Sequence, residues 1–245
     1  MMRADRFYRA SPDTERWTSS RVKVETSDLY IRASRDLSAP AERIVRLLRE
    51  ELRAQIDRQG SFHTSFTPVE RLEGSREIVG MMYDASERAG VGPMAAVAGA
   101  VAEMTGHALS GDSKELIVEN GGDVWLKLSR PSLVSLYPGG LAFRGLALVI
   151  DPALTPCGVC TSSARIGPSF SFGRADAATV IAPSAALADA LATEVCNRVT
   201  REEEMEDAAA FAMSRGAAGV LIVLRDRLLA LGRVELADLS KGAPS

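Results

Sequence analysis

Hydrophobic and polar positions alternate over residues 21–34 on either side of a Thr-Ser-Asp turn, a pattern that predicts an opening β-hairpin. The period then becomes helical: Ser38 and Pro40 suit the start of a helix, and apolar residues recur at helical spacing from Ile44 to Ile56. The other side of this helix carries several arginines and glutamates. We interpret it as a solvated face, with phosphate binding by the arginines as the alternative.

The later pattern predicts further helices and strands in a mixed order. We expect helices over residues 76–89, 92–102, 185–198 and 202–215, and strands over residues 117–128 (a hairpin), 132–137, 141–150, 178–182, 217–224 and 228–233. Hairpins mixed with helices, and no linker-like segment, indicate an α+β (mixed α/β) fold with antiparallel or mixed sheets and packed helices. We expect one compact domain over residues 1–245, with an N-terminal extension at 1–18 and a disordered tail at 241–245.

Residues 90–126 contain two unusual segments. Gly92 and Pro93 begin a helix almost without side-chain bulk, with proline at a position where its missing N–H costs nothing. The motif Asn120-Gly121-Gly122-Asp123 forms a tight turn between two strands. A buried central helix and a plain hairpin are the alternative interpretations. Together, however, a helix start and a glycine-rich turn predict a site for oxyanions.

The densest polar stretch of the chain covers residues 158–176, with five hydroxyl side chains, three glycines and two arginines. Thr161, Ser162 and Ser163 lie in it, and Asp176 ends it. Hydroxyls and free backbone N–H groups are good partners for phosphate or sugar oxygens. We therefore interpret the stretch as a ligand-binding loop, with a flexible Ser/Gly loop as the alternative.

The helix predicted over residues 185–198 carries a polar stripe among alanines. Asp189, Thr193 and Asn197 follow one another at intervals of four residues, so their side chains share one face. A carboxylate and a hydroxyl one turn apart are hard oxygen ligands of the kind that Mg²⁺ prefers. The alternative is an exposed aspartate that merely neighbours a threonine.

Composition and charge narrow the class of protein. The net charge of −3 argues against a nucleic-acid-binding surface, which needs clustered lysine and arginine. The first residues contain no apolar signal-peptide core, and the longest uncharged apolar stretch is too short to span a bilayer. We expect a cytoplasmic protein without a membrane or nucleic-acid partner.

Cysteine and histidine residues offer few functional combinations. The three cysteines include Cys157 and Cys160 in a C-x-x-C spacing, but a structural zinc site usually needs four ligands. Zinc binding and thiol redox chemistry are alternatives to two small buried residues beside a loop. His63, in a loop expected over residues 60–68, is either an acid–base group or solvent-facing, and His107 suits the C-terminal end of a helix.

With these segments in view, the chain resembles the ApbE-like superfamily, and within it a bacterial and archaeal branch without an assigned reaction. The resemblance runs from the first hairpin to the strand near Val223. It rests on the segments at residues 89–99, 119–123, 161–176 and 188–193.

The resemblance implies a function. Characterised members are FAD:protein FMN transferases, which bind FAD and Mg²⁺ and move the FMN moiety onto a Ser or Thr of a target protein. Their metal-binding aspartate and threonine correspond to Asp189 and Thr193, together with a backbone carbonyl near Met94 or Ala95. The flavin site implied for this chain involves Gly92, Pro93, Asn120, Gly121, Gly122, Asp123, Thr161, Ser162 and Ser163.

The chain also departs from the transferase pattern. Residues 92–99 contain no lysine, where the transferases carry one, and Phe172 stands where they carry a histidine. Asp176 is then the remaining candidate for a catalytic base.

Two hypotheses follow. The first is a Mg²⁺-dependent transferase acting on a phosphorylated or flavin-like small molecule such as FAD or FMN. The second is a binding protein on the same scaffold that does not turn its ligand over. A homo-oligomer is compatible with both.

Overall fold

The structure is a computed structural model and describes residues 16–137, 143, 145–164 and 173–239. Its opening hairpin, β1 (Thr18–Val24) and β2 (Ser27–Ala33), forms the edge of a large antiparallel sheet, as the alternating pattern predicts. The sheet continues through β3 (Leu116–Asn120), β4 (Asp123–Lys127), β7 (Cys157–Ser162), β8 (Ala177–Ala182), β9 (Gly219–Leu224) and β10 (Arg227–Gly232), in that spatial order. All neighbouring strands of this sheet are antiparallel, and tight turns join β1 to β2, β3 to β4 and β9 to β10, whereas helices connect β2 to β3 and β8 to β9.

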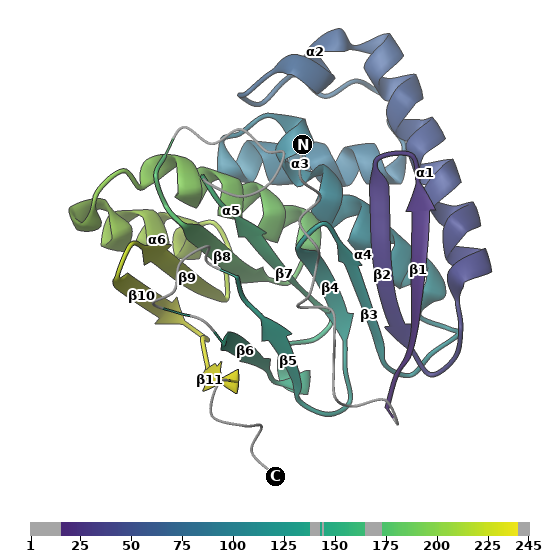
Figure 1. The fold of residues 1–245 in the computed structure, drawn as a ribbon. Coiled ribbons are helices and arrows are strands. Elements are labelled where there is room, and N and C mark those ends of the chain that lie inside the picture. Colours follow the sequence, from purple (N-terminus) through teal and green to yellow (C-terminus); the bar gives the residue numbers. More distant parts are fainter. Residues whose placement is uncertain (1–15, 138–142, 144, 165–172, 240–245) are drawn as a thin grey trace.

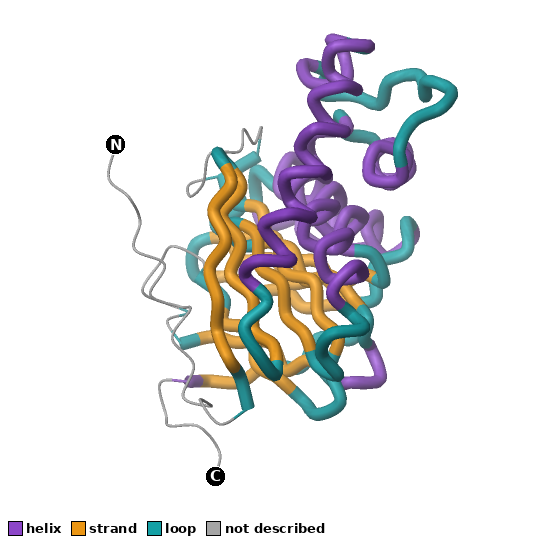
Figure 2. Tube along the Cα trace, turned by 90° about the vertical axis from the view of Figure 1, so that its right-hand side faces the viewer, coloured by secondary structure: helices purple, strands orange, loops and turns teal. Residues whose placement is uncertain are grey.

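A smaller antiparallel sheet has the order β11 (Leu236–Asp238), β6 (Leu146–Ile150), β5 (Ser132–Ser135). The helices lie together on one side of the large sheet, as Figures 1 and 2 show. They are α1 (Ser38–Arg58), α2 (Gly60–Thr64), α3 (Glu77–Ala89), α4 (Val97–Leu109), α5 (Ala185–Arg198) and α6 (Met205–Ser214). Short 3₁₀ segments are η2 (Pro93–Ala96), which precedes α4, η4 (Glu202–Glu204), which precedes α6, and η3 (Pro152–Leu154), whose Leu154 packs on the opposite face of the sheet. Within the described ranges the α+β class predicted from the sequence is confirmed.

Alternation along the central strands builds two separate hydrophobic cores, because successive side chains of a strand point to opposite faces. In β4, Trp125 joins the larger core beneath the helices, whereas Val124 and Leu126 join a second core. That second core also includes Leu148 and Ile150 of β6, so it lies between the large sheet and the small one. The central strands are therefore covered on both faces.

Several local predictions are wrong. The loop expected over residues 60–68 begins with α2, because Phe62 is fully buried and packs edge-on against Tyr83, with ring centroids 5.1 Å apart. The helix expected over residues 202–215 is divided into η4 and α6, and β11 was not predicted. The small-residue helix starts as the 3₁₀ segment η2 before α4.

Other predictions fall outside the described residues. These are most of the N-terminal extension, the tail at 241–245, the first part of the strand expected over residues 141–150, and Phe172.

Candidate functional site

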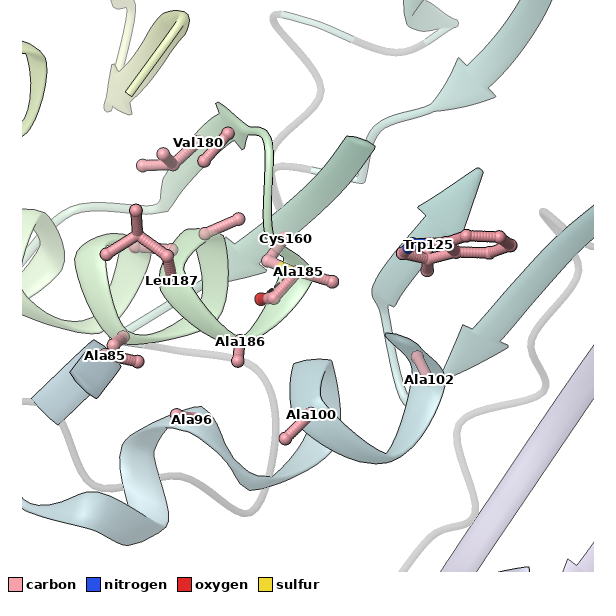
Figure 3. Packing of buried hydrophobic residues seen from close by; sticks show 14 of the residues in the cluster. Ala85, Ala96, Ala100, Ala102, Trp125, Cys160, Val180, Ala185, Ala186 and Leu187 are labelled. Atoms are coloured by element: carbon pink, nitrogen blue, oxygen red, sulfur yellow. Dashed lines mark hydrogen bonds between the residues drawn. The ribbon is translucent and has the colours of Figure 1, made fainter. Parts of the chain in front are cut away.

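Helices α4 and α5 approach closely at Gly99. A Cβ atom on Gly99 would lie 2.2 Å from the carbonyl oxygen of Ala185 and 2.9 Å from the Cβ of Asp189, so no larger residue fits without a shift. Figure 3 shows the same contact from the side chains, with Ala186 of α5 pointing toward Ala96 and Ala100. The bulk-free sequence around Gly92 and Gly99 therefore serves to bring two helix backbones together.

The close approach places Asp189 at the start of α4. Its Oδ2 atom accepts a hydrogen bond from the backbone N–H of Gly99 at 2.9 Å, and the N–H of Ala98 also donates to this carboxylate. Ala96, the residue that precedes α4, provides no side-chain cap. Asp189 thus accepts from N–H groups that the first turn of a helix leaves without partners, the role usually taken by an N-cap side chain.

The β3–β4 hairpin delivers a second carboxylate. Gly121 and Gly122 adopt φ angles of +75° and +117°, which glycine tolerates without strain, and no atom would obstruct a Cβ at either position within 4 Å. Asn120 and Asp123 face each other across this turn. The side-chain N–H of Asn120 donates to the carbonyl of Ala98 at 3.2 Å, which ties the hairpin to the start of α4.

Asp123 and Asp189 are both half-buried, and the charge of Asp123 raises the cost of ionising Asp189. Burial, with a smaller contribution from Glu119, raises the pKa of Asp123 to about 7, although contacts with the Cys160 thiol and the Thr161 N–H oppose the shift. Burial and the charge of Asp123 hold the pKa of Asp189 well above its ordinary range. Two facing carboxylates of this kind favour either a shared proton or a cation.

One oxygen of this pair has no partner. Oδ1 of Asp123 is buried and accepts no hydrogen bond from the described residues. Most buried polar atoms in proteins are hydrogen-bonded, so such an atom calls for an explanation, for example a bound ion. The donor set suits a hard divalent cation better than zinc, because it consists of oxygens. Within the described ranges no group of three or more His, Cys, Asp or Glu residues could hold a metal.

The other predicted metal ligands flank Asp189. Thr193 follows it by one turn on the same side of α5 and is also half-buried. Met94 lies in η2, which packs against α5, and its carbonyl accepts the N–H of Val97. Gly92 and Pro93 are buried at the start of η2, where a Cβ on Gly92 would meet the carbonyl oxygen of Ser65 at 1.8 Å.

The polar stretch predicted to be a loop is partly a strand. Thr161 and Ser162 belong to β7, which pairs with β8, and only Ser163 follows the strand. The hydroxyls of Thr161 and Thr179 lie 2.9 Å apart across that pair. The loop prediction was wrong here because a small, polar central strand resembles a loop in composition.

Asp176 lies at the other end of this region. Its N–H donates to the carbonyl of Val223 at 2.9 Å, and its Oδ2 accepts the N–H of Arg225, a residue with a φ of +59°. The carboxylate thus supports the turn between β9 and β10. A role as catalytic base remains a prediction.

The three cysteines are buried, and no disulfide joins any two of them. Cys157 and Cys160 lie within β7, not beside a loop, and belong to different cores on opposite faces of the sheet. Burial raises the pKa of Cys157 to about 12 and that of Cys160 well above its ordinary range. This environment is that of inert structural thiols.

Glu103 is a buried residue that the sequence interpretation missed. It lies one turn after Gly99 in α4 and is 5% exposed. Its Oε2 accepts hydrogen bonds from the Ser184 hydroxyl at 2.8 Å and from the Ala186 N–H at 3.1 Å. The only sequence signal is an acidic residue within an apolar, alanine-rich helix.

Two hollows of about 440 Å³ lie elsewhere on the described surface. One is lined by residues of α3, by Glu103 of α4, and by Ser184 and Leu187 at the start of α5. The other surrounds Arg16 and Glu115. Neither is lined by Asp123 or Asp189.

None of the helices in the described ranges has the length and apolar character needed to cross a bilayer.

Comparison with solved structures identifies the fold. The flavin transferase ApbE of Vibrio cholerae is 15% identical, with a TM-score of 0.55, and the match covers 88% of this chain and 96% of that one. The ApbE protein of Thermotoga maritima is also 15% identical, with a TM-score of 0.54, covering 92% and 98% of the two chains. The chain therefore has the ApbE fold.

Sequence comparison identifies the family. The family model described as AbpE bacteria matches residues 9–218, and the chain belongs to this family. A UPF0280 protein of Methanocaldococcus jannaschii is 37% identical over 226 residues, 89% of this chain and 92% of its own length. A UPF0280 protein of Methanopyrus kandleri is 42% identical over 189 residues, 76% of each chain. The resemblance seen in the sequence motifs is thus confirmed.

Proposed function

We propose that this protein binds a divalent cation, Mg²⁺, together with a phosphorylated, flavin-like ligand such as FAD or FMN. The observation that carries the proposal is the neighbouring pair Asp123 and Asp189, in which Oδ1 of Asp123 is buried and accepts no hydrogen bond from the described part of the chain. A cation between the two would offset the cost of ionising buried carboxylates, which raises both pKa values.

The cation would be held by Asp189, the hydroxyl of Thr193 and the carbonyl of Met94, with Asp123 facing it. These groups come from α5, from η2 and from the β3–β4 hairpin, which meet at the start of α4. When bound, the cation would neutralise charge on a phosphate oxygen of the ligand.

The ligand itself would lie over the open Gly121–Gly122 turn. Both glycines leave room for close approach of a ligand to the backbone, and Asn120 holds the turn against α4. The start of η2 at Gly92 and Pro93 and the hydroxyls of Thr161, Ser162 and Ser163 complete the set of polar groups proposed to contact it. Backbone N–H groups at a helix start and a glycine turn suit phosphate oxygens.

A second candidate function is transfer of the FMN moiety. It is favoured by the fold, whose structural neighbours are named flavin transferases, and by the Asp189–Thr193 pair. The chain lacks a lysine within residues 92–99 and carries Phe172 in place of the transferase histidine. Asp176 is engaged by the β9–β10 turn. These features favour binding without transfer.

Calorimetry with Mg²⁺, with FMN and with FAD tests the binding proposal. The informative variant is Asp189→Asn, because its amide oxygen still accepts the N–H of Gly99 while the charge is lost. We expect wild type to bind Mg²⁺, the variant to lose this binding, and flavin affinity to depend on Mg²⁺ in wild type. Asp57→Asn, on the exposed surface of α1, is the matched control and should bind as wild type does.

Equal Mg²⁺ heats for wild type and Asp189→Asn would contradict the cation site. Incubation with FAD and a Ser/Thr-containing acceptor protein, followed by intact-mass measurement, separates the two candidates. A mass gain equal to one FMN moiety would establish transfer. An unchanged mass in the presence of bound flavin supports a binding protein.

A further inference from the structure

Glu103 is a buried carboxylate that has no part in the proposed ligand site. It is 5% exposed within α4, and it lines the hollow that residues of α3 and Ser184 also border. A charged side chain in such surroundings is costly unless it is hydrogen-bonded. Its location therefore implies a specific structural task.

The task is to cap α5. Oε2 of Glu103 accepts from the hydroxyl of Ser184 and from the N–H of Ala186, the second residue of the helix. The same Ser184 oxygen accepts the N–H of Leu187. Glu103 and Ser184 thus jointly satisfy the free N–H groups of the first turn of α5. The carboxylate also suits the positive end of the helix dipole.

Asp189 performs the same task in the opposite direction. It belongs to α5 and accepts the N–H groups of Ala98 and Gly99 in the first turn of α4. Each helix therefore supplies the carboxylate that caps the other, with the Gly99–Ala185 contact between the two caps. Gly99 and Glu103 are one turn apart on α4, and Ala185 and Asp189 are one turn apart on α5.

We infer that Glu103 is a positioning residue for the cation site: by fixing the start of α5 it fixes where Asp189 meets α4. This inference rests on the proposed function. Loss of the Glu103 cap would free the first turn of α5 and leave only the cap that Asp189 provides to α4. The Gly99–Asp189 hydrogen bond and the position of Asp189 relative to Asp123 would then be less firmly held. Residues that orient a metal ligand without touching the metal typically change affinity about 10- to 100-fold when removed.

His107 offers a weaker alternative role for Glu103. Its Nε2 lies 3.7 Å from Oε1, on the same helix and largely exposed to solvent. That contact engages the other oxygen and leaves the cap of α5 unaffected. If pairing with His107 were the purpose of Glu103, changes at residue 103 would leave the amide of Gly99 unaltered.

The test compares Glu103→Leu, which removes the cap, with Glu103→Gln, whose amide oxygen still accepts hydrogen bonds. The hollow of about 440 Å³ beside Glu103 gives a leucine room. Glu204→Leu is the matched control, because Glu204 also accepts a backbone N–H and a hydroxyl, both from Thr200, but at the far end of α5. Two quantities are measured in each protein: hydrogen exchange of the Gly99 amide and the Kd for Mg²⁺.

We expect Glu103→Leu to speed exchange of the Gly99 amide at least about 10-fold and to weaken Mg²⁺ binding by about 10-fold or more, with Glu103→Gln restoring most of both. Unchanged Gly99 exchange in a folded Glu103→Leu variant overturns the inference, as does an equal change in Glu204→Leu. If Glu103→Leu does not fold, Ser184→Ala, which removes one donor to Glu103, decides in its place by the same two measurements.

Mg²⁺ binding and Gly99 exchange, taken together, separate this inference from the proposed function. If wild type binds no Mg²⁺, the proposed function is contradicted, and Glu103 then has no cation site to position. Mg²⁺ binding that is intact in wild type and in Glu103→Leu, with Gly99 exchange altered only in the variant, overturns the positioning role while leaving the proposed function standing.

Discussion

Gly99 donates its backbone N–H to Asp189 across the crossing of α4 and α5, and it can do so only because it has no side chain. The same glycine that permits the approach supplies the donor. In the sequence Gly99 stands out only as a small residue, but in the structure the position of Asp189 depends on it.

Substitution of Gly99 tests this dependence. In Gly99→Ala the new Cβ would stand 2.2 Å from the carbonyl oxygen of Ala185, so the helices must move apart. We expect a loss of about 1–3 kcal/mol in the free energy of unfolding, typical of overpacking, and weaker Mg²⁺ binding. Urea unfolding measures the first and calorimetry the second.

Gly60→Ala is the matched control, because a Cβ there meets no atom within 4 Å. It should be neutral or slightly stabilising, since alanine is the better helix former. Equal stabilities for Gly99→Ala and wild type would show that the crossing is not tightly packed at this residue.

The pH dependence of stability tests the Asp123–Asp189 pair. The pKa of Asp123 is raised from 3.8 to about 7, so the folded protein holds a proton that the unfolded chain releases. Stability from the protonated form is complete below pH 3.8 and is lost as the pH rises through 7. In Asp123→Asn the part of this loss that Asp123 causes should disappear, leaving the part due to Asp189. The melting temperature at pH 7.5 should rise by several degrees, at about 2–4 °C per kcal/mol.

Thermal melts in EDTA at pH 5.5 and 7.5 make this measurement, because the strongly lowered carboxylates Glu25, Glu115 and Glu204 have pKa values of about 2 and stay ionised throughout. The comparison uses the difference between wild type and variant, so groups common to both cancel. An identical change in melting temperature for both proteins across this interval would show that Asp123 does not hold its proton.

Local signals in the sequence predicted most of the fold. The β3–β4 hairpin was recognisable because the polar Asn-Gly-Gly-Asp turn separates two apolar runs, and α5 because Ser184 precedes a long helical pattern. Predictions were wrong where tertiary contacts decide the outcome. Phe62 makes α2 helical by packing against Tyr83, which is distant in sequence, and no local period announces that contact.

The candidate site was predictable only in part, for the same reason. Asp189 and Asp123 could be singled out by their spacing and by a resemblance to known motifs. The effect of the Asp123 charge on the pKa of Asp189 could not be predicted, because it requires two elements 66 residues apart to meet. The partners of Glu103 and Asp176, at Ala186 and Arg225, are also far away in sequence. The roles of Glu103 and Asp176 therefore depend on tertiary contacts, which no sequence motif indicates.

Thiol accessibility separates a structural role from a redox role for the C-x-x-C pair. Cys157, Cys160 and Cys196 are buried, and burial raises the pKa of the first two. We expect no modification of the native protein by iodoacetamide at pH 8 over an interval in which the urea-unfolded chain gains three adducts, as measured by intact mass. A mild oxidant should produce no disulfide between Cys157 and Cys160, because they face opposite cores. Rapid labelling of the native protein or a loss of two mass units would contradict the structural role.

Acid sensitivity should arise at Glu115, which joins the start of the described chain to the sheet. Arg16 donates to both of its oxygens, at 2.7 and 3.1 Å, and the N–H groups of Ser129 and Arg130 donate to Oε1. The hydrogen bond from Arg16 is the main reason that the pKa of Glu115 falls to about 2. Stability from the ionised form is therefore complete above pH 4.5 and decreases as the pH falls toward 2.

Glu115→Gln should cost about 1.5–3 kcal/mol at pH 7, the contribution usual for hydrogen bonds to a charged group, and progressively less below pH 4.5. Urea unfolding at pH 7 and pH 3.5 measures both values. Glu42→Gln is the control, because Glu42 forms an exposed pair with Arg46 that should contribute no more than about 0.5 kcal/mol. The two glutamates differ in that Glu115 accepts hydrogen bonds from two separate segments, at Arg16 and at Ser129 and Arg130. A cost for Glu115→Gln no larger than that for Glu42→Gln would mean that these segments hold together without the Glu115 carboxylate.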